Sequence, residues 1–370
     1  MLRLFKASRG EFFAPQMAAG VLMAALALPS PALSQPKTID EIANYTGADR
    51  QAMLEAGARK EGTVLIYTPG TQTKPLRELF RKKYPYVDLK VYQGSSSTMV
   101  RRGLEEYKAG RFIADGFAIG TGYLRILMEN NVLRPYRTPL SKKYKKEAIG
   151  PKNHWIITRE SYLGLGFNTK ETKAADLPQT YEDLIKPKFK GKLAISGRKG
   201  TLNHWVGMLQ MAMGDKYLGK LANQNWTVHS ISGKAFSNLI VAGEIPFGPA
   251  VYNSHMANSK SKGANVGWKS LGPVFSTVAG VGLARNAPSP HAALLYADIY
   301  NSKEGQRMMQ SFGYASARLD MTNPDKPNGK IYYLTERDDY SQKYIEWGKI
   351  AKKVFAKAKK VKGKKKKKKK

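Results

Sequence analysis

The sequence predicts an α/β protein with a parallel sheet, because short strands alternate with amphipathic helices across short loops. Three stretches carry this prediction. The stretch "TVLIY" is a short buried strand, "VDLKVY" alternates apolar and polar residues, and after "GSSST" the residues Val100, Leu104 and Tyr107 recur at helical spacing. With 370 residues, of which 42% are hydrophobic, the chain is long enough for two domains with cores of their own.

The first half of the chain alternates helix and strand in a regular order. A first helix is predicted to end at Gly62, and the strand "TVLIY" follows it. The next helix opens at Thr73, has Pro75 in its first turn, where a missing N–H costs little, and ends before Pro85. The strand "VDLKVY", a helix that ends at Gly110, the strand "DGFAIG" and the helix "YLRILMENN" complete the series.

The second half repeats this order. The strand "ESYLGLGFNTK" leads to a short helix opened by Thr180, with Asp183 three residues on, close to a capping box. Then come the strand "KLAIS", the Gly-rich turn "GRKGT", the helix "LNHWVGMLQMAMG" and the strand and turn "GEIPFGPAVYNS". The helix "HAALLYADIYNS" and a last amphipathic helix through Tyr340 and Trp347 precede the C-terminal tail.

The first 34 residues predict a signal peptide. Basic residues, among them Arg3 and Lys6, precede an apolar run, and Ala32 and Ser34 supply small residues before a cleavage point. The apolar run is shorter than the roughly 20 residues that cross a bilayer. We therefore expect residues 1–34 to be removed and the protein to be exported to the periplasm.

The net charge of +34 is unevenly distributed. Thirteen lysines and no acidic residue lie from Lys352 to the end, which leaves +21 for the rest of the chain. Residues 352–370 are predicted to be a disordered poly-Lys tail, because such a run buries nothing. The remaining charge predicts a positive field that attracts acidic ligands or surfaces. A basic exported protein that binds an anionic envelope surface is therefore one interpretation.

Several classes of function find no support in the sequence. The chain has no cysteine, which removes disulfides, thiolate nucleophiles and cysteine metal sites, and its five histidines are too scattered for a local metal motif. No Walker, H-E-x-x-H or G-x-S-x-G motif is present. Basic residues outside the tail are spread without interleaved aromatic residues. We expect no enzyme, no cofactor and no nucleic-acid partner.

The stretch "GSSST" raises the question of ligand binding directly. It places three serines and a threonine where a strand ends and a helix begins, although a helix needs only one capping hydroxyl. Hydroxyls and free backbone N–H groups at a helix start favour an anion. In parallel sheets, ligands also bind beyond the carboxyl ends of the strands. The alternative interpretation is a Ser-rich turn with no ligand.

The order of several further stretches resembles the exported solute-binding proteins of ABC importers. These stretches are "EGTVLIYT", "GLGFNTK", "PKFKGKLAI", "AGEIPFG" and "NSKEGQ", and the resemblance covers roughly residues 45 to 345. The branch in question includes binders of ferric ion, polyamines, phosphonates and sugar phosphates. The resemblance implies a two-lobe, type II periplasmic-binding-protein fold with mixed or parallel sheets and a ligand cleft between the lobes. It also implies a monomer that delivers a small solute to an ABC permease in the inner membrane.

The resemblance sets the expected lobe boundaries. Lobe one is expected to comprise residues 35–160 together with 276–351, and lobe two residues 161–275. The chain is expected to cross from one lobe to the other near Ser161–Thr169 and to return near Ser276–Leu283.

Positions after the predicted strands give the candidate ligand-binding residues. Two hydroxyl-bearing helix starts that face each other across a cleft would suit a carboxylate, phosphate or phosphonate. The candidates from lobe one are Thr68, Ser95, Ser96, Ser97 and Thr121, and those from lobe two are Ser196, Lys199, Gly200, Thr201, Tyr252 and Asn253.

A receptor for ferric ion or an iron chelate is the alternative within the same class. Ferric binders of this branch commonly carry adjacent tyrosines just after the strand that matches "GEIPFGPAVYNS". Here the positions are Tyr252, Asn253, Ser254 and His255, with a single tyrosine. Ferric ion prefers several anionic oxygen ligands, so we expect no metal site, with Tyr252 and His255 as the only candidate ligands.

Overall fold

The fold is described from a computed structural model, which describes residues 38–69, 73–323, 326–327, 331–333 and 339–362. The predicted signal peptide, residues 1–34, lies outside the described residues. The α-helices are α1 (Ile39–Asn44), α2 (Arg50–Glu61), α3 (Thr73–Lys83), α4 (Ser96–Lys108), α5 (Thr121–Glu129), α6 (Lys199–Ala222), α7 (Gly233–Val241), α8 (Asn253–Lys260), α9 (Pro290–Asn301), α10 (Lys303–Ser311) and α11 (Tyr340–Val354). None of the helices in the described segments is both long and apolar enough to span a bilayer.

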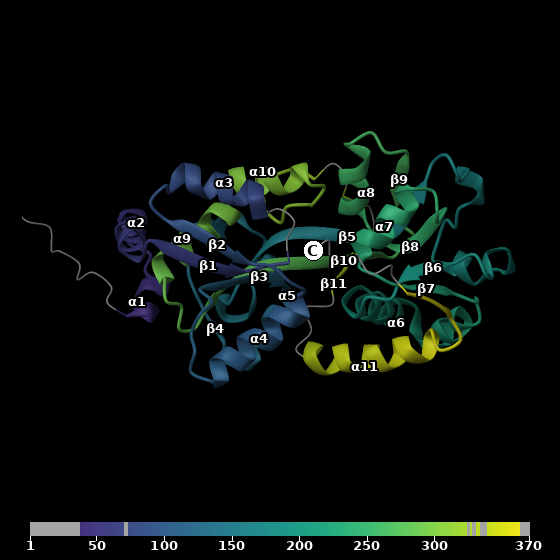
Figure 1. Ribbon diagram of the computed structural model, residues 1–370, viewed down its shortest axis with the longest axis horizontal. Coiled ribbons are helices and arrows are strands. Elements are labelled where there is room, and N and C mark those ends of the chain that lie inside the picture. Colours follow the sequence, from purple (N-terminus) through teal and green to yellow (C-terminus); the bar gives the residue numbers. More distant parts are fainter. Residues whose placement is uncertain (1–37, 70–72, 324–325, 328–330, 334–338, 363–370) are drawn as a thin grey trace, which may run out of the picture. The chain divides into compact units, whose positions relative to one another are not determined.

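The strands form two sheets (Figure 1). The larger has nine strands in the order β2-β1-β3-β10-β5-β8, with β4 and β11 paired to β10 and β9 paired to β5. The smaller has the order β12-β7-β6, and all its pairs are parallel. The strands are β1 (Thr63–Tyr67), β2 (Asp88–Tyr92), β3 (Gly116–Gly120), β4 (Leu133–Arg134), β5 (Ile156–Asn168), β6 (Ala194–Ser196), β7 (Thr227–Ser230), β8 (Phe247–Tyr252), β9 (Val266–Lys269), β10 (Val274–Ala284), β11 (Ile331–Tyr333) and β12 (Lys359–Lys362).

The first hydrophobic core surrounds β1, β2 and β3, which are parallel as predicted. The preceding helix α2 ends because Gly62 adopts the left-handed conformation, with φ of 64°, and donates to Ala58 O at 2.9 Å. Helices α3, α4, α5 and α9 bury apolar side chains in this core, including Phe80, Met99 and Leu124. Strand and helix order along this part of the chain therefore agrees with the sequence prediction.

Two long strands, β5 and β10, connect the first core with the second. They pair in antiparallel fashion, and β5 also pairs with β8 and β9 (Figure 1). Both strands lie where the sequence predicted that the chain passes between lobes. Strand β5 pairs with β10 over its first half and with β8 and β9 toward its end, so three strands fix its position.

The second core contains large aromatic side chains from distant parts of the chain. The indole of Trp205 lies 5.7 Å from that of Trp226, which lies 5.3 Å from the ring of Phe355. Helix α11 packs along α6, where the indole of Trp347 lies against Gly207, a position at which a Cβ would come within 2.4 Å of it. The last helix therefore packs in the second core rather than the first.

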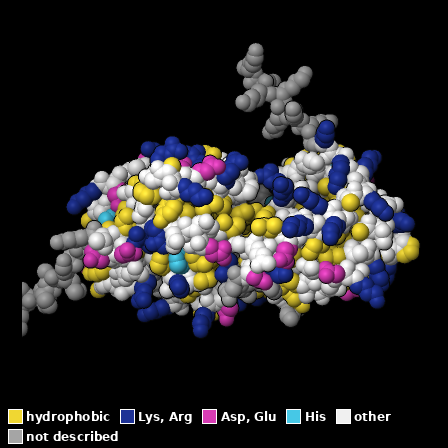
Figure 2. All heavy atoms as spheres, turned by 90° about the horizontal axis from the view of Figure 1, so that it is seen from below, with side chains coloured by type: hydrophobic (Ala, Val, Ile, Leu, Met, Phe, Trp, Pro, Cys, Tyr) yellow, Lys and Arg dark blue, Asp and Glu magenta, His cyan; other side chains and the backbone are white. Residues whose placement is uncertain are grey.

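The C-terminal segment differs from the prediction of a disordered tail from residue 352. Residues 352–354 complete α11, and residues 359–362 form β12, which pairs with β7. For residues 352–362 the prediction of disorder is therefore wrong, and residues 363–370 lie outside the described residues. Backbone pairing orders β12 without burying its lysines, which are exposed. Dark blue Lys and Arg side chains are frequent on the face shown in Figure 2.

Candidate functional site

At the serine-rich start of α4, the side-chain hydroxyls mainly cap the helix and bond one another. The hydroxyl of Ser95 accepts a hydrogen bond from the backbone N–H of Thr98 at 3.1 Å. It also lies 3.0 Å from the hydroxyl of Ser97 and 2.7 Å from that of Thr98. Ser97 is exposed and Ser96 is partly exposed. Within the described part of the chain, no side-chain hydrogen bond joins these three serines to α6.

Two other first-core candidates lie at the carboxyl ends of strands. Thr68 is buried after β1, and its backbone N–H donates to Tyr92 O at 3.1 Å. Thr121 is the first residue of α5 and is 1% exposed. Its hydroxyl is buried and has no hydrogen-bond partner among the described residues.

The start of α6 is built differently from that of α4. Its N-cap residue, Arg198, makes no side-chain hydrogen bond to the helix. Lys199 is exposed, Thr201 is buried, and a Cβ on Gly200 would lie 3.3 Å from the hydroxyl of Tyr123 on α5. Glycine therefore allows the start of α6 to come close to the tyrosine of α5. Burial, the largest cause, raises the pKa of Tyr123, and the positive charge of the nearby Arg198 opposes part of this rise.

Two of the predicted ligand-binding residues hold the scaffold together. Ser196 is fully buried, and its hydroxyl donates to Ile231 O at 2.7 Å. The side-chain oxygen of Asn253 accepts from the backbone N–H of Tyr162 at 2.8 Å, and its side-chain nitrogen donates to Gly313 O at 3.2 Å. Both residues fix loops beside the site, and their polar groups have partners within the chain.

Tyr252 follows β8 and contacts both the start of α6 and the crossing strands. Thr201 and Thr277 lie close to the Tyr252 side chain. Burial, the largest cause, raises the pKa of Tyr252, and the two threonine hydroxyls oppose part of this rise. The imidazole of His255 packs edge-on against the Tyr252 ring, with centroids 5.3 Å apart, and its Nδ1 lies 3.0 Å from the Ser237 hydroxyl. Among the predicted ligand-binding residues, three therefore lie near one another: Gly200, Thr201 and Tyr252.

The same region includes three further tyrosines and a histidine, which come from α5, α6 and α11. The hydroxyls of Tyr123 and Tyr344 lie 3.0 Å apart, and Nε2 of His204 lies 2.6 Å from the Tyr340 hydroxyl. We call Tyr123, Tyr252, Tyr340 and Tyr344 the tyrosine cluster. Burial raises the pKa of every tyrosine in it and lowers the pKa of His204 to about 4. At neutral pH the phenols are therefore neutral hydrogen-bond donors.

Arg159 on β5 is a cation without an acidic partner among the described residues. The register of β5 with β10 and β8 places Arg159 on the same face of the sheet as Thr277 and Tyr252. Its guanidinium donates to the hydroxyl of Tyr300 at 2.9 Å and lies 5.4 Å from the ring centroid of Tyr314. Guanidinium has five N–H donors and stays protonated. A charge that protein carboxylates leave unpaired is suited to an anionic ligand.

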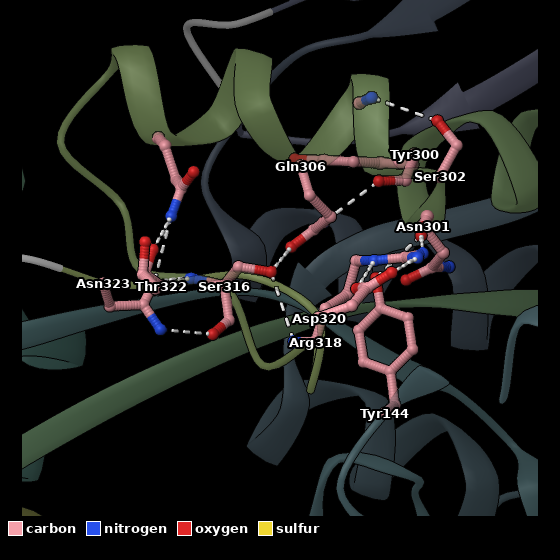
Figure 3. Close-up of polar contacts among 12 residues, drawn as sticks. Tyr144, Tyr300, Asn301, Ser302, Gln306, Ser316, Arg318, Asp320, Thr322 and Asn323 are labelled. Carbon is pink, nitrogen blue, oxygen red and sulfur yellow. Dashed lines mark hydrogen bonds and ion pairs between the residues drawn. The ribbon is translucent and has the colours of Figure 1, made fainter. Parts of the chain in front are cut away.

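The loop that carries Tyr314 is fixed by a network of polar side chains (Figure 3). The Ser316 hydroxyl donates to Oε1 of Gln306 at 2.7 Å, and the Ser316 backbone N–H donates to Oδ1 of Asn323 at 2.7 Å. The backbone N–H of Arg318 donates to the Ser316 hydroxyl at 3.2 Å. These bonds hold Tyr314, and with it one contact of Arg159, in a defined position.

A small pocket of about 130 Å³ adjoins Tyr314, below the roughly 300–1,000 Å³ that is usual for small-molecule sites. The pocket is lined by Tyr162, Asn253, Gln310, Gly313, Tyr314, Ala315, Asn323 and Lys326.

The structure adds residues that sequence reasoning missed. Arg159 carries the only positive charge in the strand "IITRESYLGLGFN", which was a local signal. Tyr123, Tyr314 and Tyr344 gave no such signal, because they come from three separate segments that only the fold brings together. For metal binding, no group of three His, Asp or Glu side chains with suitable placement exists among the described residues.

Comparison with protein families identifies the class of protein. The family model of bacterial extracellular solute-binding proteins matches residues 116–338, more than half of the chain. The chain therefore belongs to this family of exported proteins, which capture small solutes for ABC permeases and are transport proteins rather than enzymes. No curated protein sequence matches the chain.

Solved structures with a similar fold confirm the predicted two-lobe, type II α/β architecture. Iron-bound HitA from Pseudomonas aeruginosa has 19% sequence identity and a TM-score of 0.67 over 79% of this chain and 99% of its own. Trichodesmium FutA (IdiA), in complex with iron and citrate, has 19% identity and a TM-score of 0.63 over 79% and 99%. AfuA from Actinobacillus pleuropneumoniae, with fructose 6-phosphate bound, has 19% identity and a TM-score of 0.61 over 80% and 98%.

Proposed function

We propose that this receptor captures a small anionic solute, of the carboxylate, phosphate or phosphonate type, beside Arg159 and the start of α6. The observation that carries the proposal is Arg159, a guanidinium whose contacts in the described residues are two tyrosines and no carboxylate. A bidentate anion would complete its hydrogen bonding and neutralise its charge.

The start of α6 supports the same class of ligand. Its first backbone N–H groups receive no side-chain cap, and a helix N-terminus carries a partial positive charge. Thr201 and Tyr252 add hydroxyls that are neutral donors at physiological pH. Similar proteins bind different anions: AfuA binds fructose 6-phosphate and FutA holds iron with citrate.

We propose that the two cores are the two lobes, and that solute between them stabilises a closed form for delivery to an inner-membrane permease. Contacts from both lobes would exist only in the closed form, so ligand binding would shift the population toward it. Residues 35–160 and 276–333 would form lobe one. Because α11 packs on α6, we assign α11 to lobe two with residues 161–275, in place of the earlier limit at residue 351. We expect a monomer in the periplasm.

A thermal-shift screen of the purified protein tests the ligand class. The panel holds phosphonates, sugar phosphates, dicarboxylates, aromatic acids, polyamines, and ferric ion with and without citrate. A ligand at 100 times its Kd stabilises the folded state by about 2.7 kcal/mol. We expect a shift with one anionic class, and titration calorimetry then gives its Kd.

Two arginine substitutions make the result specific. Arg159→Gln should weaken binding of the anion about 100-fold. Arg159→Lys should weaken binding less, because the positive charge remains although the planar guanidinium is lost. The matched control is Arg101→Gln on α4, whose side chain is 73% exposed and which should leave the Kd unchanged. An unchanged Kd in Arg159→Gln, or a shift with polyamines alone, contradicts the anion proposal but leaves the receptor class intact.

A receptor for ferric ion or an iron chelate is the second candidate. The tyrosine cluster favours it, because the phenol oxygens of Tyr123 and Tyr344 lie 3.0 Å apart and phenolate is a hard ligand for ferric ion. Iron bound in this way would give a visible phenolate-to-iron charge-transfer band that Tyr252→Phe reduces. A stabilising shift with ferric citrate without this band would indicate that the protein recognises the citrate anion.

A further inference from the structure

We propose that the β12-β7-β6 sheet carries an attachment surface for the anionic headgroups of a lipid bilayer. This inference does not depend on which solute the receptor captures. The surface consists of exposed lysines around the smaller sheet and is called the lysine face. Its residues are Lys188, Lys190, Lys192, Lys220, Lys357, Lys359, Lys360 and Lys362.

Backbone hydrogen bonds bring the three segments of the lysine face together. The N–H of Gly191 donates to Gln224 O at 2.8 Å, which joins the segment before β6 to the end of α6. The N–H of Lys359 donates to Trp226 O at 2.8 Å, which joins the start of β12 to the start of β7. Because β12 is the edge strand of the sheet, one side of it is open to an external partner.

The segments that supply the lysine face contain no acidic residue. These segments are residues 184–214, 216–243 and 347–362. Dark blue side chains are frequent at the right-hand end of Figure 2, where the smaller sheet lies. Each lysine near an anionic membrane surface adds to the attraction, which falls off within a Debye length. Eight lysines together therefore favour attachment.

The composition of the lysine face favours a bilayer over nucleic acid. Residues 188–192 and 357–362 contain lysines and no arginine, so they offer point charges rather than the planar forks that bind phosphate groups in pairs. Its aromatic residues, Phe189, Trp226 and Phe355, are buried and present no ring on which a base could stack. Membership in a family of exported solute-binding proteins also places the protein beside a membrane.

Vesicle co-sedimentation of the full chain tests the proposal. Phosphatidylcholine vesicles with about 30 mol % phosphatidylglycerol are compared with pure phosphatidylcholine at low and high salt. We expect binding only to the anionic vesicles and only at low salt. The triple variant K188E/K190E/K192E should bind at least about 100-fold more weakly.

A second triple variant separates a defined surface from overall charge. K82E/K90E/K108E makes the same change in net charge with exposed lysines of the first core, and both variants keep residues 363–370. We expect this control to lose no more than about threefold. Circular dichroism confirms that each variant is folded, and K188Q/K190Q/K192Q, which should lose about tenfold or more, provides a neutral version if charge reversal disturbs folding.

Four outcomes would overturn the proposal. Equal losses in the two triple variants would mean that net charge alone attracts the vesicles. No loss in K188E/K190E/K192E would assign binding to residues outside the lysine face. Displacement by millimolar glycerophosphate would indicate a discrete phosphate site. Tighter binding to single-stranded RNA than to vesicles at equal phosphate concentration would indicate a nucleic-acid surface.

Discussion

The starts of α4 and α6 have similar sequences and different chemistry. Both follow a strand of a parallel pair, and both contain hydroxyl side chains next to glycine. At the start of α4, Ser95 bonds the backbone N–H of Thr98 and its hydroxyls bond one another. At the start of α6, Arg198 supplies no cap, and Thr201 lies close to Tyr252 from another segment.

This difference shows that the number of hydroxyls at a helix start is a poor guide to ligand binding. Three serines in a row predicted an anion site, yet Ser95 satisfies the helix by itself. The start of α6 has fewer hydroxyls but leaves its N–H groups uncapped and lies close to Tyr123. A helix start is available to a ligand when its own side chains do not cap it.

The largest expected effect is a pH dependence of the free energy of unfolding, caused by His204 on α6. Burial lowers the pKa of His204 to about 4, whereas in the unfolded chain it titrates near 6.5. Its contribution to stability is full above pH 6.5 and is lost as the pH falls toward 4. Wild type should therefore lose on the order of 2–3 kcal/mol more than His204→Gln between pH 7.5 and 4.5.

Urea unfolding at the two pH values measures this difference. His255, whose pKa is also lowered to about 4, by burial and the nearby Lys234, is present in both proteins and cancels. Parallel loss of stability in wild type and His204→Gln would show that His204 titrates normally in the folded protein.

Next in size is the effect of Thr201 on affinity. Thr201→Val removes the hydroxyl at the start of α6 while keeping the volume, and should weaken the anionic ligand about tenfold, or about 1.4 kcal/mol. Calorimetry with the ligand found in the screen measures it. The same loss of affinity in Thr98→Val on α4 would remove the distinction between the two helix starts.

A smaller and opposite result is expected at Ser95. Ser95→Ala removes a helix cap and should lower the free energy of unfolding by about 1 kcal/mol while leaving the Kd unchanged. Chemical denaturation and calorimetry on the same preparation test both parts. Weaker ligand binding with unchanged stability would restore the original interpretation of the serines as an anion cradle.

The smallest effect is expected at Ser96, which has no capping bond in the described structure. Ser96→Ala should change the unfolding free energy by less than about 0.5 kcal/mol and the Kd by less than twofold. Combined with Thr201→Ala, it should add nothing to the loss caused by Thr201→Ala alone. A synergistic loss in the double variant would indicate that both helix starts contact the same solute.

The sequence was sufficient for the fold. Strand and helix order followed from periodicity, and Gly62 ends α2 in the left-handed conformation that glycine allows. Gly200, Thr201 and Tyr252 were chosen because ligand sites lie after strands in such sheets, and their role in binding stays a prediction. The C-terminal strand β12 was missed, because its lysines remain in solvent and only pairing with β7 orders it.

Arg159 stands out in its own segment as the only positive charge, but this signal does not show whether the charge is paired. Whether Arg159 can bind a ligand depends on its neighbours in the fold. Tyr300, whose hydroxyl accepts a hydrogen bond from Arg159, is 141 residues away in the sequence. An arginine in a strand is usually paired with an acid, and only the assembled fold shows that the described residues supply none. Absence of a partner is a property of packing and leaves no local pattern.

Helix α11 connects two regions with separate proposed roles. Its first turns carry Tyr340 and Tyr344 of the tyrosine cluster, and its last turn leads within a few residues to Lys357 of the lysine face. Fifteen residues of α-helix form a rod about 22 Å long that is stiff along its axis. Because α11 is one continuous helix, the ends that carry Tyr344 and lead to Lys357 move together as a single rigid element.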